Sequence, residues 1–560
     1  MYVGLDLIGS RESVGEAIEN CNRADADFAL VDIRISMGPA NFVRIDDLSS
    51  DQLNNSIVGR VNLMPHIQDV TAEVLLQCGW ANHAGFYAIL LDLSLLSLMH
   101  LCSVISDFMV AHPPEHSVTR IWISCKPEQW STWNQIRTIT AYPSKLAVCL
   151  DLSESLSDFH EAWFAEPVAA VVLPKATKIP DSILLRFLRQ NTQPIVRDPS
   201  QIPAILSTVR SFPALEYHET YISPYHDTLQ LPLQPLRDEM ENVVYETFEA
   251  DKPKYDLYRD AIKKSIAKIS AVNCHIAVVG AGRGGLVEAS LDAIRSLADP
   301  DVPRRFTITC VEKNRFAAIS LNHKLLNKWN TPNTPKIVIE NIDMRDWRPD
   351  QKVDILVSEL LGSLGDNEAS PECLNASVME RLSPARGVSI PHRYFSSLEP
   401  VSAHKAWSQV RDMKKFQMPL VTLFHTHSRP SVQGPKMLFE FVHARDSAAN
   451  ELEQSRSLTW TMAYDTCIHG FAGYFHCDLD EEGECVMSID PRTATPRMVS
   501  WFPAFLPLQT PVYVQQGATV QLFVRRRSTK SRMWIEWTLI QPSPQPTNNL
   551  DGAFHSVGLI

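Results

Sequence analysis

Eight short apolar segments recur through the first 213 residues, and most of them are followed by a stretch with helical periodicity. These predicted strands span residues 2–7, 28–35, 56–63, 86–94, 120–126, 145–153, 168–176 and 193–198. Strands that alternate with helices favour a parallel sheet, and eight such units in about 210 residues are what a small (β/α)8 barrel requires. We therefore predict a TIM-like barrel over residues 1–213.

Aspartates close several of these predicted strands, at Asp6, Asp32, Asp92, Asp151 and Asp198. Active sites of such barrels lie at the carboxyl ends of the strands, so a glycosidase-like carboxylate pair is one interpretation. The other interpretation is that these aspartates cap the following helices or accept hydrogen bonds from loop amides. No single pair stands out, and we favour the second interpretation.

Two further domains follow the barrel. Residues 214–390 begin as a proline-punctuated linker that becomes helical, and then four apolar strands alternate with helices, at 275–280, 306–314, 336–347 and 353–361. This alternation predicts a doubly wound, Rossmann-like domain. From 391 to 560 the apolar runs become short and alternating, with turns and prolines between them, which predicts an antiparallel β-barrel or sandwich. The fold class is therefore α/β followed by β.

Composition excludes several classes of protein. The formal net charge of −12 argues against a nucleic-acid binder and suits a basic partner. The first residues lack the basic head and apolar centre of a signal peptide. Residues 93–110 are apolar enough to raise the question of a membrane helix, but they contain four serines, His100 and Asp107, which favours a buried helix of a soluble protein.

The eleven cysteines contain no CxxC pair and no secretory pattern, which is typical of reduced thiols in the cytosol or nucleus. Three of them lie near two histidines, so a metal cluster is conceivable, at Cys467, Cys477, Cys485, His469 and His476. The spacing fits no zinc pattern, and we predict strand residues and no metal.

A glycine-rich turn follows the first strand of the Rossmann-like domain, in the sequence HIAVVGAGRGG. Gly280, Gly282 and either of the next two glycines satisfy both G-x-G-x-G and the dinucleotide fingerprint, in which glycine lets the backbone approach a ligand. Glu312 ends the second strand, where an acid would bind ribose hydroxyls, and Asp343 with Met344 ends the third, where they would recognise adenine. Together these features favour S-adenosylmethionine over a nicotinamide dinucleotide or a turn without a ligand.

The fourth strand runs into SELLGSLGDNE, which places Glu359 at the carboxyl end of the strand and Glu368 on a glycine-hinged loop. A guanidinium matches carboxylates bidentately, whereas two carboxylates without a cation repel each other. We predict that the two glutamates hold an arginine side chain. The alternative is that one of them caps the helix expected near SPECLNA.

These motifs resemble the type II protein arginine methyltransferases of the protein arginine N-methyltransferase 5 family. The resemblance covers nearly the whole chain and is strongest from about residue 228, through PLQPLRDEMENVVYETFEADKPKY, GAGRG, VEKN, DMRDW, SELLGSLGDNE, SPECL, GVSIP, HGFAGYF, SWFPAFLPL and a final GLI. The resemblance implies a barrel for docking and oligomerisation, a methyltransferase domain and a C-terminal β domain. It also implies a homo-oligomer, with a dimer as the expected form.

The resemblance also implies roles for individual residues. Those that would bind the cofactor are Tyr245, Lys254, Tyr255, Gly280, Gly282, Glu312, Asp343 and Met344. Glu359 and Glu368 would grip the target arginine, and Trp501 would stack on its guanidinium. Phe248 would be the bulky residue tied to symmetric dimethylation, and Gln230 and Leu233 would touch the peptide backbone. Without the resemblance, Tyr245, Phe248 and Tyr255 would be assigned to the packing of an amphipathic helix.

The implied reaction transfers methyl groups from S-adenosylmethionine to terminal guanidino nitrogens, giving monomethylarginine, symmetric dimethylarginine and S-adenosylhomocysteine. Expected substrates are histone tails, Sm-type proteins and other Gly-Arg-rich RNA-processing proteins, in the cytoplasm and nucleus. The short barrel lacks most of the loops by which relatives hold a WD-repeat adaptor. Leu364 replaces the usual phenylalanine in the glutamate loop, which would either loosen the arginine slot or repack it. A catalytically inactive scaffold and a nicotinamide-dependent oxidoreductase are the rival hypotheses.

Overall fold

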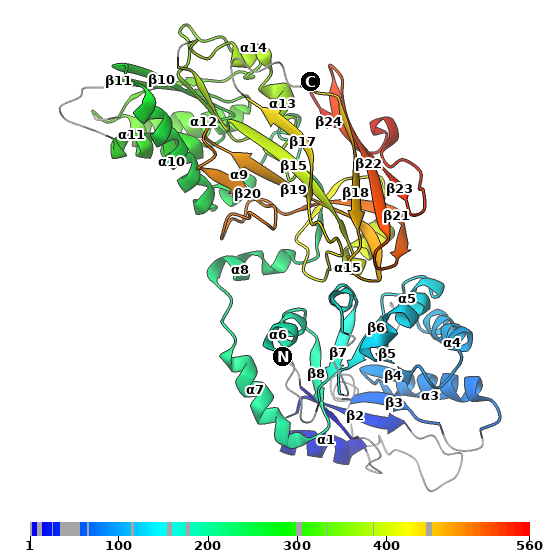
Figure 1. The fold of residues 1–560 in the computed structure, drawn as a ribbon. Coiled ribbons are helices and arrows are strands. Elements are labelled where there is room, and N and C mark those ends of the chain that lie inside the picture. Colours follow the sequence, from blue (N-terminus) through cyan, green and yellow to red (C-terminus); the bar gives the residue numbers. More distant parts are fainter. Residues whose placement is uncertain are drawn as a thin grey trace.

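The computed structural model describes residues 3–7, 14–24, 26–33, 57–63, 67–113, 117–153, 159–174, 180–297, 305–332, 334–384, 386–443 and 451–559 of the 560-residue chain. The predicted architecture is confirmed: a closed parallel barrel, a parallel five-stranded sheet and antiparallel sheets follow one another along the chain. Figure 1 shows the barrel, in blue to cyan, at one end of the molecule and the other two parts together at the other end.

All eight predicted barrel strands are present, and β1 pairs with both β2 and β8, which closes the sheet. The strands are β1 (Gly4–Asp6), β2 (Phe28–Ile33), β3 (Ile57–Val61), β4 (Ala88–Asp92), β5 (Arg120–Cys125), β6 (Leu146–Asp151), β7 (Val168–Val172) and β8 (Gln193–Val196). The helices around them are α1 (Val14–Arg23), α3 (Val70–Ala84), α4 (Leu98–Ala111), α5 (Trp130–Ile139), α6 (Asp181–Arg189) and α7 (Ile202–Ser211).

The barrel is a packed core, because alternate strand residues fill its interior. Phe28 and Leu30 from β2, with Trp122 from β5, belong to this inner cluster. Gly4 leaves room for the Phe28 ring, since a Cβ there would lie 2.2 Å from Phe28 Cζ.

The strand-end aspartates divide into two groups. Asp92 and Asp198 accept hydrogen bonds from loop amides, as predicted, from Ser94 N at 2.8 Å and Ser200 N at 3.0 Å. The other three form ion pairs that the sequence did not reveal: Arg60 with Asp6 (2.6 Å) and Asp32 (3.0 Å), and Arg197 with Asp151 (3.1 Å). Asp151 also accepts a predicted loop-amide hydrogen bond, from Ser153 N at 2.9 Å. Arg60 lies on β3 and Arg197 directly follows β8, so these ion pairs link different strands at the carboxyl end of the barrel.

The apolar stretch at 93–110 forms α4 from Leu98 onward, and this helix buries one face only. Leu101, Val104, Ile105 and Phe108 are buried, whereas Val110 is 83% exposed. Among the residues that the structure describes, no helix combines the length and the apolar content that a membrane crossing demands.

The second part begins with α8 (Tyr217–Ile222) and β9 (Leu229–Gln230), and its sheet has the order β12-β11-β10-β13-β14 with every pair parallel. The strands are β10 (Asn273–Val279), β11 (Arg305–Val311), β12 (Lys336–Glu340), β13 (Ile355–Ser358) and β14 (Val388–Ile390). The helices are α9 (Asn242–Glu249), α10 (Lys252–Lys268), α11 (Gly285–Ser296), α12 (Arg315–Lys324) with a π-helical extension η5 (Leu325–Trp329), α13 (Ser370–Cys373) and α14 (Ala376–Met379). The strand order reverses between β10 and β13, where open α/β sheets bind ligands.

Two sheets face each other in the third part. The larger has the order β17-β15-β19-β21-β16-β9, with β20 beside β19, and the smaller has the order β18-β22-β23-β24. Their bounds are β15 (Arg393–Val401), β16 (Leu420–Thr422), β17 (Lys436–Val442), β18 (Gln454–Thr461), β19 (Thr466–Asp478), β20 (Val486–Ser488), β21 (Ala504–Val514), β22 (Thr519–Ser528), β23 (Arg532–Gln541) and β24 (Val557–Gly558). The same part contains the helix α15 (His404–Met413) and a 3-10 helix, η6 (Leu550–Gly552). Trp460 of β18 packs on Phe471 of β19 with ring centroids 5.6 Å apart, so the sheets share a core.

Two details differ from the sequence prediction. The sequence predicts four strands in residues 214–390 and none at Val388–Ile390, but β14 pairs parallel with β13 and completes the second sheet. Part of the predicted linker is a strand, because β9 pairs with β16 and forms an edge of the larger sheet. Strands of two or three residues are too short for periodicity to show which sheet they join.

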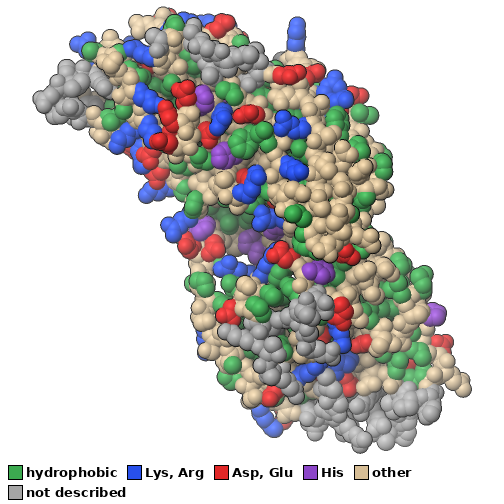
Figure 2. All heavy atoms as spheres, viewed as in Figure 1, with side chains coloured by type: hydrophobic (Ala, Val, Ile, Leu, Met, Phe, Trp, Pro, Cys, Tyr) green, Lys and Arg blue, Asp and Glu red, His purple; other side chains and the backbone are tan. Residues whose placement is uncertain are grey.

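The barrel contacts the third part through side chains of both. Tyr142 stacks on His404 with centroids 5.5 Å apart, and Arg411 donates to the carbonyls of Ala141 (2.9 Å) and Tyr142 (3.0 Å). On the face seen in Figure 2, acidic and basic side chains are interspersed.

All eleven cysteines lie in the described part of the chain, and each is buried and outside any disulfide. Cys467 and Cys477 both belong to β19, ten positions apart, so they are separated by roughly 33 Å of extended strand. They cannot share one ion, which agrees with their assignment as strand residues.

Candidate active site

The glycine turn joins β10 to α11, and two tyrosines pack directly on it. A Cβ on Gly282 would lie 3.0 Å from Tyr245 Cε1, and one on Gly285 would lie 2.6 Å from the hydroxyl of Tyr255. Gly282 also has φ +52°, a conformation that favours glycine. The turn therefore has glycine where aromatic side chains of α9 and α10 approach the backbone.

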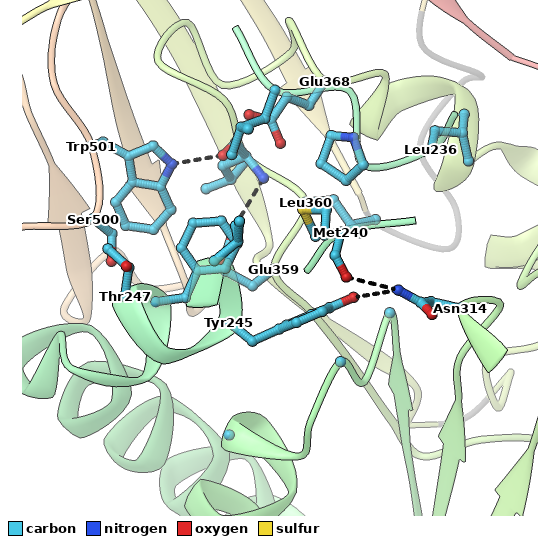
Figure 3. A pocket seen from close by; sticks show the side chains of 18 of the residues that line it. Leu236, Met240, Tyr245, Thr247, Asn314, Glu359, Leu360, Glu368, Ser500 and Trp501 are labelled. Carbon is cyan, nitrogen blue, oxygen red and sulfur yellow. Dashed lines mark hydrogen bonds between the residues drawn. The ribbon is translucent and has the colours of Figure 1, made fainter. Parts of the chain in front are cut away.

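Glu312 follows β11 and is tied to the same turn. Its carboxylate accepts hydrogen bonds from Gly282 N and Asn314 N, both at 2.7 Å. Burial raises the pKa of Glu312, although these two N–H groups oppose the shift. Asn314 Nδ2 also donates to the Tyr245 hydroxyl at 3.3 Å (Figure 3). Glu312, Asn314 and Tyr245 thus form one polar wall.

Asp343 and Met344 follow β12, as predicted. Both oxygens of Asp343 are held by Arg345, through Nε at 3.0 Å and Nη2 at 2.8 Å, and Arg345 N donates at 2.8 Å. Burial alone would raise the pKa of Asp343, but the hydrogen bonds and charge of Arg345 hold it below its ordinary value. Asp343 is therefore a fixed anion at the strand end.

Glu359 follows β13 directly, and its two carboxylate oxygens have different partners. Oε1 accepts from Leu361 N at 3.1 Å, and Oε2 lies 3.4 Å from Lys254 Nζ. The Lys254 side chain is only 1% exposed. Both partners thus present N–H groups to the Glu359 carboxylate.

Glu368 lies in a different environment on the same loop. It does not cap the following helix, since α13 has Ala369 at its N-cap and no side-chain cap. Burial and the nearby charge of Glu359 raise the pKa of Glu368 well above its ordinary value, with Lys254 opposing them. The two glutamates therefore have different surroundings: Glu359 contacts two N–H donors, whereas burial favours the neutral form of Glu368 until a cation enters.

The loop between the glutamates is braced from the third part of the fold. Arg526 of β22 is fully buried and donates to Asp366 at 2.6 Å and to Glu372 at 2.8 and 2.9 Å. Leu364 is 1% exposed and packs against Gly473, where an added Cβ would lie 2.5 Å from Leu364 Cδ2. Leu364 does not line the cavity, which agrees with repacking rather than with a looser slot.

Three aromatic rings surround the Lys254 ammonium. Its distances to the ring centroids are 4.9 Å for Trp501, 5.0 Å for Tyr255 and 5.2 Å for Phe248, within the range of cation–π contacts. Trp501 Nε1 donates to the Leu361 carbonyl at 2.7 Å, which ties this ring to the glutamate loop.

The loop that carries Trp501 is held by a residue that the sequence analysis missed. Asp251, which is fully buried, accepts hydrogen bonds from Val499 N at 3.0 Å and Ser500 N at 2.7 Å. It precedes α10, the helix of Lys254 and Tyr255. Asp251 therefore joins two walls of the site that are about 250 positions apart along the chain.

These walls enclose a cavity of about 390 Å³. Figure 3 shows Glu359, Glu368 and Trp501 around one part of it, and Tyr245 with Asn314 around another. The predicted site residues that line it are Gln230, Leu233, Tyr245, Phe248, Tyr255, Gly280, Gly282, Glu312, Asp343, Met344, Glu359, Glu368 and Trp501. Lys254 is the exception: the structure places it behind the aromatic wall, against Glu359 and away from the cavity.

The residues that line the cavity suit a nucleoside bound next to a cationic side chain. Strand-end acids and glycine-turn amides at a switch point are typical of a ribose and adenine site. Two carboxylates and a tryptophan face suit a guanidinium. Among the described residues there is no group of three or more His, Cys, Asp or Glu side chains placed to hold a metal ion.

Three family models match the chain in the order of its parts. They are the PRMT5 TIM barrel domain at residues 47–183, the PRMT5 arginine-N-methyltransferase at 216–390 and the PRMT5 oligomerisation domain at 393–557. The chain is 33% identical over 487 residues to protein arginine N-methyltransferase 5 of rice (Oryza sativa subsp. indica), with 77% of this chain and 73% of the relative covered. The protein of the same name from Xenopus laevis is 31% identical over 467 residues, with 77% and 71% covered. Protein arginine N-methyltransferase skb1 of Schizosaccharomyces pombe is 31% identical over 518 residues, with 84% and 81% covered.

Proposed function

The chain belongs to the PRMT5 family of arginine N-methyltransferases, and we propose that it is a type II enzyme. It uses S-adenosylmethionine to convert protein arginines to monomethylarginine and symmetric dimethylarginine. The observation that carries this proposal is the single cavity lined both by the two glutamates and by the glycine turn with its strand-end acids.

The methyl donor is proposed to bind along the glycine turn. Glu312 would accept hydrogen bonds from the ribose hydroxyls, and Asp343 would accept one from the adenine amino group beside Met344. The rings of Tyr245 and Tyr255, packed on Gly282 and Gly285, would form the opposite wall. When bound, S-adenosylmethionine supplies an electrophilic methyl group on a sulfonium.

The target arginine is proposed to enter between Glu359 and Glu368, with Trp501 against the face of its guanidinium. At about 4 Å and an effective dielectric near 20, each carboxylate attracts the guanidinium by roughly 4 kcal/mol. The two carboxylates would hold positive charge on one side of the guanidinium and leave the other nitrogen aimed at the methyl group. Positioning of this kind contributes several kcal/mol to catalysis.

Glu368 is the proposed proton acceptor. Lys254 and Leu361 N contact the Glu359 carboxylate, whereas burial favours the neutral form of Glu368. The bound guanidinium supplies the countercharge that lets Glu368 ionise. Methyl transfer would add one positive charge to the guanidinium, and the methylated nitrogen would then release a proton to Glu368, which leaves a methylguanidinium with a single charge.

Symmetric dimethylation is proposed to depend on Phe248, which lines the cavity beside Trp501 and Tyr255. A bulky ring there would leave no room for a nitrogen that already carries one methyl group. The second methyl group would then go to the other terminal nitrogen.

Partners and location are also part of the proposal. Basic, Gly-Arg-rich proteins such as histone tails and Sm-type proteins suit a chain with a net charge of −12. The match to an oligomerisation domain supports a homo-oligomer, for which we propose a dimer. We further propose that the protein works in the cytoplasm and nucleus, and that the short barrel binds a WD-repeat adaptor weakly or not at all.

The test is incubation with deuterated S-adenosylmethionine and a Gly-Arg-rich peptide, followed by mass spectrometry of the products. Symmetric dimethylarginine loses monomethylamine on fragmentation, and the asymmetric isomer loses dimethylamine. We expect only the first loss, and the second would exclude a type II enzyme. Calorimetry with S-adenosylhomocysteine and with NAD separates the rivals, since an inactive scaffold would bind neither and an oxidoreductase would bind NAD.

A further inference from the structure

Residues Val557–Leu559, far from the glutamates in sequence, pack directly behind the proposed site. Val557 and Gly558 form β24, which pairs with Met533 and Arg532 of β23, and Leu559 N donates to the Ser531 carbonyl at 2.8 Å. Val557 is 1% exposed and Leu559 is 5% exposed. Figure 1 shows β24 beside α13, the helix that follows the glutamate loop. We call Val557–Leu559 the terminal brace.

One contact of the terminal brace leads to the acid that would bind adenine. Arg345 Nη1 donates to the Leu559 carbonyl at 2.5 Å, while Nη2 and Nε of the same guanidinium donate to Asp343. The guanidinium is planar and rigid, so fixing one of its nitrogens fixes the direction of the others. The Leu559 carbonyl thus sets the orientation in which Arg345 holds Asp343.

A second contact leads to the glutamate loop. Val557 and Leu559 form a buried cluster with Met533 and Ala369, the residue after Glu368. Ala369 is fully buried and has φ +66°, a conformation that residues other than glycine rarely adopt. Such a backbone persists only where the surrounding packing enforces it. Leu236, which lines the cavity, packs on the same cluster.

We propose that the terminal brace is a positioning element. It holds Asp343, the proposed adenine-binding acid, and the loop that carries Glu368 at fixed positions relative to each other. Arg345 acts through Asp343, and Leu559 acts through Ala369. The inference rests on the proposed function, because it concerns how that site is held. The inference predicts that the two contacts affect different steps. The contact with Arg345 affects binding of the cofactor, and the packing of Leu559 on Ala369 affects the methyl-transfer step.

The first test concerns Arg345→Met. The reagents are S-adenosylhomocysteine and S-inosylhomocysteine, in which an oxygen acceptor replaces the adenine amino donor, and calorimetry gives both dissociation constants. With Asp343 held, the wild type prefers the adenosyl ligand, and we expect Arg345→Met to reduce this preference about tenfold, the size of one lost hydrogen bond to a charged group. Arg345→Lys, which keeps the charge without the planar fork, should also lose most of the preference. A preference that stays within twofold of the wild type in both variants would overturn the assignment.

The second test concerns Leu559→Ala. We expect kcat with a Gly-Arg-rich peptide to fall about tenfold while the dissociation constant of S-adenosylhomocysteine changes less than twofold. Leu559→Met conserves the volume and should restore kcat to within threefold of the wild type. Phe554→Ala is the matched control, since Phe554 is in the same region and 62% exposed. All assays are run below the melting temperature of each variant, and equal kcat for Leu559→Ala and Phe554→Ala would overturn the role of Leu559.

The outcomes also separate this inference from the proposed function. A wild type that binds S-adenosylhomocysteine and methylates the peptide, with Arg345 and Leu559 variants that match it, refutes the brace alone. A folded wild type that does neither refutes the proposed function, and the brace with it.

Discussion

Replacement of either glutamate by its neutral isostere is the sharpest test of the proposed arginine clasp. Glu359→Gln and Glu368→Gln keep the size of each side chain and remove one negative charge. Each carboxylate contributes roughly 4 kcal/mol of attraction at about 4 Å and an effective dielectric near 20. Since 1.36 kcal/mol corresponds to a factor of ten in rate, we expect kcat/KM for a peptide arginine to fall about 10³-fold in each variant.

The two variants should differ in stability, because the structure gives the two glutamates different partners. Glu359→Gln removes the counterion of Lys254, whose side chain is 1% exposed, and should destabilise the fold by about 2 kcal/mol, the cost of weakening a buried charged contact. Glu368→Gln removes a group that burial already drives toward its neutral form, so it should be neutral or stabilising. Urea unfolding of the two variants measures this difference directly.

The assay combines methylation kinetics with calorimetry of S-adenosylhomocysteine, whose affinity should change less than threefold, because neither glutamate is assigned to the nucleoside. Glu380→Gln is the matched control, since this glutamate is exposed on the surface after α14. Activity within tenfold of the wild type in either variant would refute the two-carboxylate clasp. Equal destabilisation of both variants would refute the asymmetry of the pair.

Three further predictions test other parts of the structure. Phe248→Met should allow some asymmetric dimethylarginine to form, and products that contain only the symmetric isomer by mass spectrometry would contradict the steric role of Phe248. Arg526→Met leaves two buried carboxylates without their cation and should lower the free energy of unfolding by about 3–5 kcal/mol in urea titrations, with a loss below about 1 kcal/mol as the contrary result. Burial lowers the pKa of three histidines to about 3, 3 and 4, namely His404, His427 and His443. The unfolded chain therefore binds more protons than the folded chain below pH 6.5. The free energy of unfolding should then fall by about 2 kcal/mol for each histidine as the pH drops from 6.5 to 5. A free energy of unfolding that does not change over this pH range would contradict the prediction.

The sequence predicts the elements of this fold well because their signals are local. Every barrel strand and the first four strands of the parallel sheet have apolar runs bounded by turns or helices. The signal fails for β9 and β14, which are two and three residues long and are defined by the strands they meet. The hydrophobic period and the length of a segment indicate whether it is a helix or a strand, but they say much less about which strand it pairs with.

The residues of the candidate site also fall into two groups, those that the local sequence reveals and those that it does not. Glu359 and Glu368 could be found because one loop carries both, next to a buried strand. Arg526 lies in the sequence FVRRR, which is typical of a solvent-exposed basic segment, so its burial could not be predicted from this segment alone. Its buried position follows from strand alternation, since Val520, Leu522, Val524 and Arg526 face inward in succession along β22. The alternation was visible in the sequence, but the acids that Arg526 meets are more than 150 positions away.

The supports of the glutamate loop explain why this site needs both the parallel sheet and the β domain. The two glutamates and the strand-end acids all come from the second part of the fold. Yet the contacts that hold the loop come from later residues: Arg526 on its charged side, Gly473 behind Leu364, and Leu559 behind Ala369. Two carboxylates that lie near each other disfavour each other's charged form, so the surrounding structure must hold them in place against that repulsion. Residues 214–390 alone would therefore carry the proposed catalytic groups without the geometry, and the energy for that geometry comes from the core shared with the β-sandwich.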